Sequence, residues 1–226
     1  MIIEQIYTKC LAQGAYYIES DGEAAVIDPL REPTPYIERA KKNKAKIKYI
    51  FETHIHADFV SGHLDLAKKT AATIVFGPNA NTHYDCYNAV DGETFKIGSL
   101  TLKVMHTPGH TLESVSYLLI DAAGKNHALF SGDTLFLGDV GIPDVAQQYK
   151  GLSKEKLAEM LFDSLRSKIM TLEDNIILYP AHGAGSACGK NMSKDTIGTL
   201  GDQKISNSVS YTHLRAHETL RYLVCR

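Results

Sequence analysis

The stretch Thr53–Phe59, which reads Thr-His-Ile-His-Ala-Asp-Phe, constrains the fold of this chain more than any other segment. It follows the apolar run Ile47–Phe51, which predicts a buried strand. If the chain stays extended beyond that strand, the two-residue period places His54, His56 and Asp58 on one side. Two imidazoles and a carboxylate that converge at a strand end suit a divalent transition metal. An isolated His-x-His pair, however, is more often a pair of solvated loop residues.

Three further fragments favour the metal interpretation: Thr-Pro-Gly-His at 107–110, Ser-Gly-Asp at 131–133 and Tyr-Pro-Ala-His at 179–182. Each places a histidine or aspartate at a turn next to an apolar run. Gly132 is expected to let the backbone come close to a metal or ligand. All the candidate donors are nitrogen or oxygen, which suits zinc, ferrous iron or manganese and disfavours a thiolate cluster. The donors are His54, His56, Asp58, His110, Asp133 and His182.

Composition sets limits on the class of protein. The 226 residues are enough for one large domain or two small ones, and 44% hydrophobic residues are enough for a sizeable core. A formal charge of -2 gives no reason to expect a nucleic acid or an anionic membrane as partner. Neither a transmembrane run nor a signal-peptide pattern is predicted. The cysteines have no paired spacing, which favours a reduced, cytoplasmic setting; they are Cys10, Cys86, Cys188 and Cys225.

The pattern of elements predicts an α/β sandwich rather than an alternating doubly wound sheet, because strands cluster on both sides of a few helices. Ser153 is the predicted N-cap of a helix that runs to Lys168. The other predicted helices cover 33–43 and 64–70. The predicted strands cover 2–8, 15–20, 23–28, 47–51, 72–76, 95–97, 100–106, 115–120, 128–130 and 175–179.

The combination of His-x-His-x-Asp, Thr-Pro-Gly-His, Gly-Asp and Tyr-Pro-Ala-His resembles the metallo-β-lactamase superfamily, over residues 1 to about 206. Within it, ETHIHADFVSGHLDLA, SGDTLFLGDVG and YPAHGAGSACGKNMS are similar to persulfide dioxygenases, particularly bacterial forms fused to rhodanese domains. The resemblance implies an αββα sandwich over residues 1–207, with the metal at one edge between the two sheets.

The resemblance also implies the roles of the site residues. It assigns one Fe(II) per chain to His54, His110 and Asp133, with Zn as a substitute, and it makes the remaining candidates outer groups that orient ligands and substrate. Those groups are His56, Asp58 and His182. Phe59 stands where dinuclear zinc hydrolases of the superfamily carry a further histidine, so a donor to a second metal is missing.

The implied activity is the oxidation of a low-molecular-weight persulfide, glutathione persulfide in the first place, by O2 to sulfite and thiol, as in sulfide detoxification. One alternative is a zinc-dependent thioester hydrolase of the glyoxalase II kind. A second is a non-catalytic persulfide carrier that acts with a rhodanese through Cys188. Relatives of this kind are often homo-oligomers.

The chain departs from the persulfide dioxygenase pattern at several positions. Many relatives have arginine where Ile142 stands, which suggests a different carrier, such as coenzyme A persulfide or a protein persulfide. Cys188 is expected either to approach the site, with its pKa lowered by Lys190, or to be a small buried residue. The tail at 208–226 matches none of the relatives; a terminal amphipathic helix, an interaction tail and a non-native segment are the alternatives.

Overall fold

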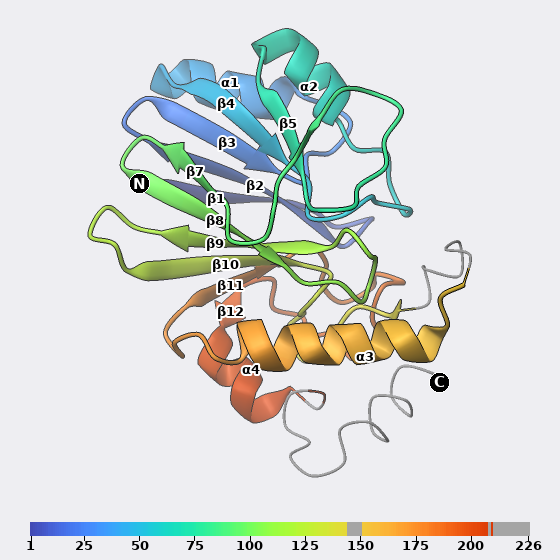
Figure 1. Cartoon of the computed structure of the whole chain (residues 1–226). Helices are drawn as coiled ribbons and strands as arrows, with labels where there is room; N and C mark the ends of the chain where they lie inside the picture. Colours follow the sequence, from blue (N-terminus) through green and yellow to red (C-terminus); the bar gives the residue numbers. More distant parts are fainter. Residues whose placement is uncertain (144–150, 208, 210–226) are drawn as a thin grey trace.

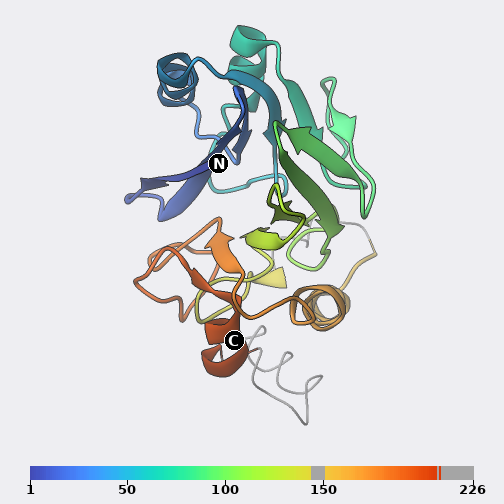
Figure 2. The same cartoon turned by 90° about the vertical axis from the view of Figure 1, so that its left-hand side faces the viewer.

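Two six-stranded sheets pack face to face, and helices cover both outer faces (Figures 1 and 2). The computed structural model describes residues 1–143, 151–207 and 209, so the atypical tail predicted at 208–226 lies outside the described residues apart from Val209. The predicted α/β sandwich with αββα layers is confirmed.

The first sheet has the order β1-β2-β3-β4-β5-β6. Its first three strands are antiparallel, and β3 to β6 run parallel to one another. Helix α1 connects β3 to β4 and helix α2 connects β4 to β5, and both lie over the outer face (Figure 1). The bounds are β1 Ile2–Thr8, β2 Gln13–Ser20, β3 Glu23–Ile27, α1 Thr34–Asn43, β4 Lys46–Phe51, α2 His63–Thr70, β5 Thr73–Phe76 and β6 Tyr87–Asn88.

The second sheet has the order β12-β11-β10-β9-β8-β7. Strands β7 to β10 form an antiparallel meander, and β11 lies parallel to β10 after a crossover through α3. The bounds are β7 Thr94–Ile97, β8 Leu100–His106, β9 Val115–Ile120, β10 Asn126–Gly132, α3 Lys154–Ser164, β11 Ile177–Pro180, β12 Gly198–Thr199 and α4 Leu200–Ser206. The short elements β6, β12 and α4 were not predicted, because they are too short to establish a hydrophobic period.

The long helix predicted at 153–168 is present in two parts. Ser153 is its N-cap, as expected, and its side chain accepts a hydrogen bond from the Lys156 amide. After Ser164 the helix widens into the π-helical turn η2, Leu165–Ile169. Lys168 in this turn donates to Asp91 and to the carbonyl of His106 at the end of β8. The widened turn therefore ties the helical layer to a strand end beside the site.

The core between the sheets is rich in buried aromatic side chains. Tyr16, Phe51, Tyr117 and Phe130 are at most 1% exposed. Tyr16 and Phe130 meet edge to face, with ring centroids 5.1 Å apart. Burial of such a ring stabilises the fold by about 1.5–3 kcal/mol. The Tyr16 hydroxyl also donates to the carbonyl of Pro180 at the end of β11, at 2.6 Å. These contacts hold the strand ends of both sheets at one edge of the sandwich.

Candidate metal centre

His54, His110 and Asp133 come together from three loops, which follow β4, β8 and β10 respectively. One ligand atom of each lies within 4.8 Å of the other two. Asp133 Oδ2 is 3.4 Å from His110 Nε2 and 3.9 Å from His54 Nε2. All three residues are buried. An ion that keeps such ligands at about 2.0–2.2 Å sets them roughly 3–4 Å apart, so this triad has the spacing of a metal site.

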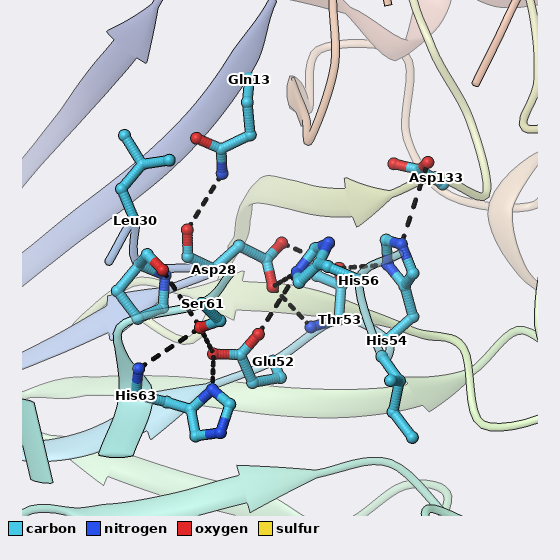
Figure 3. A network of polar contacts seen from close by, with 12 residues as sticks. Gln13, Asp28, Leu30, Glu52, Thr53, His54, His56, Ser61, His63 and Asp133 are labelled. Atoms are coloured by element: carbon cyan, nitrogen blue, oxygen red, sulfur yellow. Dashed lines mark hydrogen bonds and ion pairs between the residues drawn. The ribbon is translucent and has the colours of Figure 1, made fainter. Parts of the chain in front are cut away.

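Outer hydrogen bonds orient both histidines of the triad. His54 Nδ1 lies 3.0 Å from Thr53 Oγ1, and the Thr53 hydroxyl itself donates to Asp28, so the imidazole N–H donates to Thr53 (Figure 3). His110 Nδ1 donates to the carbonyl of Ile142 at 2.8 Å. Both Nε2 lone pairs are therefore free to face Asp133. A histidine that binds a metal through one ring nitrogen typically donates a hydrogen bond from the other, as these two histidines do through Nδ1.

The charges of the triad also suit a cation. Burial lowers the pKa of His54 well below its ordinary value, and the neighbouring His56 adds to the effect, so the ring is neutral. Burial alone would raise the pKa of Asp133, but the His182 imidazole and the other site histidines hold it well below the usual range. His182 Nδ1 donates to Asp133 Oδ1 at 2.9 Å, which leaves Oδ2 for the two triad histidines. The triad thus presents two imidazole nitrogens and one anionic oxygen.

Glycines at two turns are required by the backbone and by close packing. Gly132 has a φ of +55°, and a Cβ there would lie 2.7 Å from the Thr53 side chain. Gly109 has a φ of +145°, and a Cβ there would lie 2.3 Å from Leu161 of α3. The neighbour that requires glycine at position 132 is the Thr53 side chain, and the expectation that Gly132 lets the backbone approach a metal or ligand stays a prediction.

The prediction of an extended chain through His54, His56 and Asp58 is wrong, although the His54 and His56 rings lie 4.2 Å apart, centroid to centroid. The chain bends at several residues after β4 instead of staying extended, so the two-residue period ends with the strand. His54 joins the triad, and His56 lies between Asp28 and Glu52. Asp58 faces His182, with Oδ2 2.8 Å from Nε2.

His56 belongs to a buried cluster of opposite charges (Figure 3). Its Nε2 is 3.0 Å from Asp28 Oδ1 and 3.3 Å from Glu52 Oε2. Burial would lower the pKa of His56, but the two carboxylates outweigh burial and raise it to about 10. Glu52 also accepts from the Ser61 hydroxyl at 2.6 Å and lies 3.1 Å from His63 Nδ1. The Nε2 atom of His56 is therefore held by carboxylates, while its ring lies 4.2 Å from the ring of His54, centroid to centroid.

Sequence reasoning did not assign roles to three members of this cluster. Asp28 ends a predicted strand, which is the signal that identified the other site residues. Glu52 and His63 flank the His-x-His-x-Asp segment. The Phe59 ring lies 4.4 Å from the His56 ring, centroid to centroid, and so covers the cluster on one side.

A cavity of about 280 Å³ opens onto the triad. Its walls are mainly apolar, and Ile142 stands among them. A cavity of this kind admits a small ligand and shields part of it from water. The lining residues are His54, Ile55, Ala57, Asp58, His110, Ile142, Ala187 and Cys188.

Cys188 lines the cavity, so the expectation that it approaches the site is confirmed. The expectation that Lys190 lowers the pKa of its thiol is wrong. Burial raises the pKa of the Cys188 thiol above its ordinary value, and the nearby His182 only partly opposes this. Lys190 is exposed, and its backbone amide donates to Asp139. Lys190 is not among the groups that shift this pKa.

The helices of the described residues include none that is long and apolar enough to cross a membrane.

Comparison with known proteins identifies the family. Residues 9–84 match the family described as the metallo-beta-lactamase superfamily. A crystal structure of a metallo-beta-lactamase from Staphylococcus aureus subsp. aureus COL is 36% identical, with a TM-score of 0.89 over 99% of this chain and 67% of that one. ETHE1 from Myxococcus xanthus is 25% identical, with a TM-score of 0.79 over 99% of this chain and 91% of that one.

A curated relative from Arabidopsis thaliana, named cytoplasmic hydroxyacylglutathione hydrolase, is 32% identical over 78% of this chain and 66% of its own length. The first curated relatives are covered over 60–66% of their length, so this chain spans less than two thirds of them. Family match, fold and the arrangement of histidines and aspartates agree, and the chain belongs to the metallo-beta-lactamase superfamily.

Proposed function

We propose that this chain is a non-heme Fe(II) persulfide dioxygenase, which oxidises a low-molecular-weight persulfide with O2 to sulfite and thiol. The observation that carries the proposal is the composition of the triad. His54, His110 and Asp133 form a two-histidine, one-carboxylate set, and the adjacent His56 turns its Nε2 to Asp28 and Glu52 instead. Two histidines and one carboxylate with open positions suit ferrous iron that reacts with oxygen.

In this proposal His54, His110 and Asp133 would hold the iron, which when bound supplies a redox-active centre for persulfide and O2. Two neutral imidazoles and one carboxylate leave a divalent ion with a net positive charge. That charge favours a deprotonated persulfide over a neutral thiol. The same nitrogen and oxygen donors also accept zinc as a substitute.

The surroundings of the triad define what the protein itself contributes. The Thr53 hydroxyl and the Ile142 carbonyl keep the two histidines in the metal-binding tautomer. Ile55 and Ala57 line the cavity and limit the access of water to a bound sulfur. We propose His56, Asp58 and His182 as outer groups, with His182 orienting Asp133 through its 2.9 Å hydrogen bond.

Glutathione persulfide is the proposed first substrate. Ile142 lines the cavity and offers no cation to an anionic carrier, so coenzyme A persulfide and protein persulfides are the competing carriers. A rhodanese partner and a homo-oligomeric state are further proposals, which rest on the resemblance to the fused persulfide dioxygenases. Similarity to ETHE1 supports the proposed class.

The second candidate is a zinc-dependent thioester hydrolase of the glyoxalase II kind. Curated relatives at 29–35% identity are named hydroxyacylglutathione hydrolases, and their names support this candidate more strongly than the dioxygenase. In such a hydrolase zinc lowers the pKa of bound water to about 7. The geometry opposes it, because Phe59 stands where dinuclear hydrolases carry a histidine and because His56 is held by two carboxylates. The third candidate is a persulfide carrier that acts through Cys188, and this role requires no reaction at a metal.

One paired experiment separates the candidates. Protein loaded with iron under anaerobic conditions is given glutathione persulfide, and oxygen uptake and sulfite are measured together. Zinc-loaded protein is given a hydroxyacylglutathione thioester. Matching oxygen uptake and sulfite, abolished by His110→Ala and retained by the exposed-site control His83→Ala, supports the dioxygenase. Thioester hydrolysis without oxygen uptake contradicts it and supports the hydrolase, and neither activity in folded, loaded protein favours the carrier.

A further inference from the structure

We propose that a second cavity, next to the cavity at the triad, binds a small organic ammonium compound, which is an amine with an apolar body. This second cavity has a volume of about 310 Å³. His54 and Ile55 line both cavities, and the other lining residues differ. The proposal goes beyond the proposed function, because it concerns another binding site and holds whether the triad serves an oxygenase or a hydrolase.

The buried carboxylate of Glu52 is the polar end of the second cavity. Glu52 is 1% exposed and lines this cavity. It accepts a hydrogen bond from the Ser61 hydroxyl at 2.6 Å and lies 3.1 Å from His63 Nδ1 and 3.3 Å from His56 Nε2. An ionised carboxylate has about four acceptor positions, so one remains for a donor on a ligand.

His63 offers a second acceptor at the same end of the cavity. Its Nδ1 is turned to Glu52 (Figure 3). A neutral imidazole with its proton on Nδ1 keeps a lone pair on Nε2. His63 Nε2 is buried, and it has neither a hydrogen bond nor an ion pair among the described residues. A buried polar atom without a partner is unusual in a folded protein, so a ligand that donates hydrogen bonds suits this end of the cavity.

The charges at this end favour a cation over an anion. Asp28 and Glu52 share one imidazolium, because His56 Nε2 lies 3.0 Å from Asp28 Oδ1 and 3.3 Å from Glu52 Oε2. Two carboxylates therefore face one cationic ring, and a positively charged donor on a ligand offsets the remaining negative charge. An anionic ligand would instead add a like charge in a buried place.

Aromatic and aliphatic side chains form the walls and the rim of the second cavity. Phe59, Phe76 and Tyr84 line it, and the faces of such rings attract an ammonium group. Val60 and Leu64 also line it and are 63% and 48% exposed, whereas the carboxylate lies at the buried end. The ammonium group of the ligand is therefore expected at the buried end, and its apolar body at the exposed rim.

Titration calorimetry on the whole, zinc-loaded chain tests the proposal with phenethylammonium, its neutral isostere phenethyl alcohol and the anion hydrocinnamate. At neutral pH we expect saturable binding of one phenethylammonium per chain, at least about fivefold weaker binding of the alcohol, and no binding of hydrocinnamate. Glu52→Gln is expected to bring the affinities for the ammonium compound and the alcohol within about twofold of each other, because it removes only the charge. His110→Ala, which removes a ligand of the triad, is expected to bind phenethylammonium as wild type does.

Tryptophan substitutions at the rim locate the bound amine. Leu64→Trp and Val60→Trp place a large ring at the mouth of the second cavity and are expected to weaken binding by at least about tenfold, with unchanged circular dichroism because both positions are exposed. Ile205→Trp is the matched control, since Ile205 is 73% exposed on α4 and lines neither cavity. Absence of phenethylammonium binding, equal affinity for the alcohol, binding by both rim variants as tight as in wild type, or loss of binding in folded His110→Ala would overturn the proposal.

Discussion

The Tyr117 hydroxyl donates a 2.9 Å hydrogen bond to the main-chain carbonyl of Glu52. Tyr117 lies on β9 of the second sheet, and Glu52 is the residue that follows β4 of the first sheet. Both side chains are buried. This bond joins the sheets directly before Thr53 and His54, so the core of the sandwich fixes where the metal-binding loop begins.

Tyr117→Phe is expected to lower the free energy of unfolding by about 1–3 kcal/mol, because it leaves the buried Glu52 carbonyl without its donor while the ring still fills the core. Urea denaturation of the metal-free protein measures the change. The control is Tyr87→Phe, whose hydroxyl bonds to Glu93 in an exposed position; it is expected to change stability by less than about 0.5 kcal/mol. Equal stabilities of Tyr117→Phe and wild type would contradict the role assigned to this bond.

Removal of a triad ligand is expected to release the metal. His110→Ala deletes an imidazole, and Asp133→Asn deletes the negative charge while keeping the shape. Loss of an outer partner alone costs about 10–100-fold in metal affinity, so loss of a ligand is expected to exceed that range. Iron content after dialysis against a weak chelator measures the effect. Exposed His83 is the matched control, and His83→Ala is expected to bind iron as wild type does; retention of iron by Asp133→Asn would exclude Asp133 as a ligand.

Phe59→His is expected to add a nitrogen donor near Asp58 and His182, which are an ion pair in the present chain. The new imidazole would tighten binding of zinc next to Asp58 and His182, and it would raise hydrolysis of a hydroxyacylglutathione thioester above the wild-type rate. Isothermal titration with Zn²⁺ and a thioester assay measure the two effects. Phe59→Leu, which changes the ring without adding a donor, is the control. An unchanged zinc affinity in Phe59→His would show that position 59 does not face a metal in this chain.

Asp91→Asn is expected to weaken the fold near neutral pH. Burial would raise the pKa of Asp91, but Lys168 and the His106 amide outweigh burial and lower it below the model-peptide value of 3.8. A carboxyl whose folded pKa is depressed stabilises the fold above its unfolded pKa, and this contribution disappears as pH falls through the folded pKa. The pair is mostly solvent-exposed, so a loss of about 0.5–1 kcal/mol is expected at pH 7.

Thermal or urea denaturation at pH 7 and near pH 3 checks this dependence, with the difference between Asp91→Asn and wild type shrinking at the lower pH. Glu159→Gln is the control, since it removes an exposed pair with Lys156 on one helix and is expected to cost less. A difference that stays constant from pH 7 to pH 3 would contradict an electrostatic origin.

Much of the fold follows from local patterns in the chain. The apolar run before Thr53 forms β4, and the helix after Ser153 begins with the expected cap. Each of these depends on neighbouring residues, so periodicity and capping chemistry are enough to predict it. The π-helical turn at Leu165–Ile169 was not predicted. Lys168 in this turn contacts Asp91 and His106, which lie far away in the sequence, and a local pattern contains no information on such contacts.

The sequence by itself determined which residues are the candidate metal ligands, since His54, His110 and Asp133 each stand in a motif beside an apolar strand. Only the tertiary structure decided how these residues are grouped. It turned His56 toward Asp28 and Glu52, turned Asp58 toward His182 and placed Cys188 beside His182. The way in which these residues are grouped depends on the bends after β4 and on carboxylates that come from other strands, such as Asp28, which lies beside His56. Those contacts join parts of the chain that lie far apart in sequence, so no local period contains them.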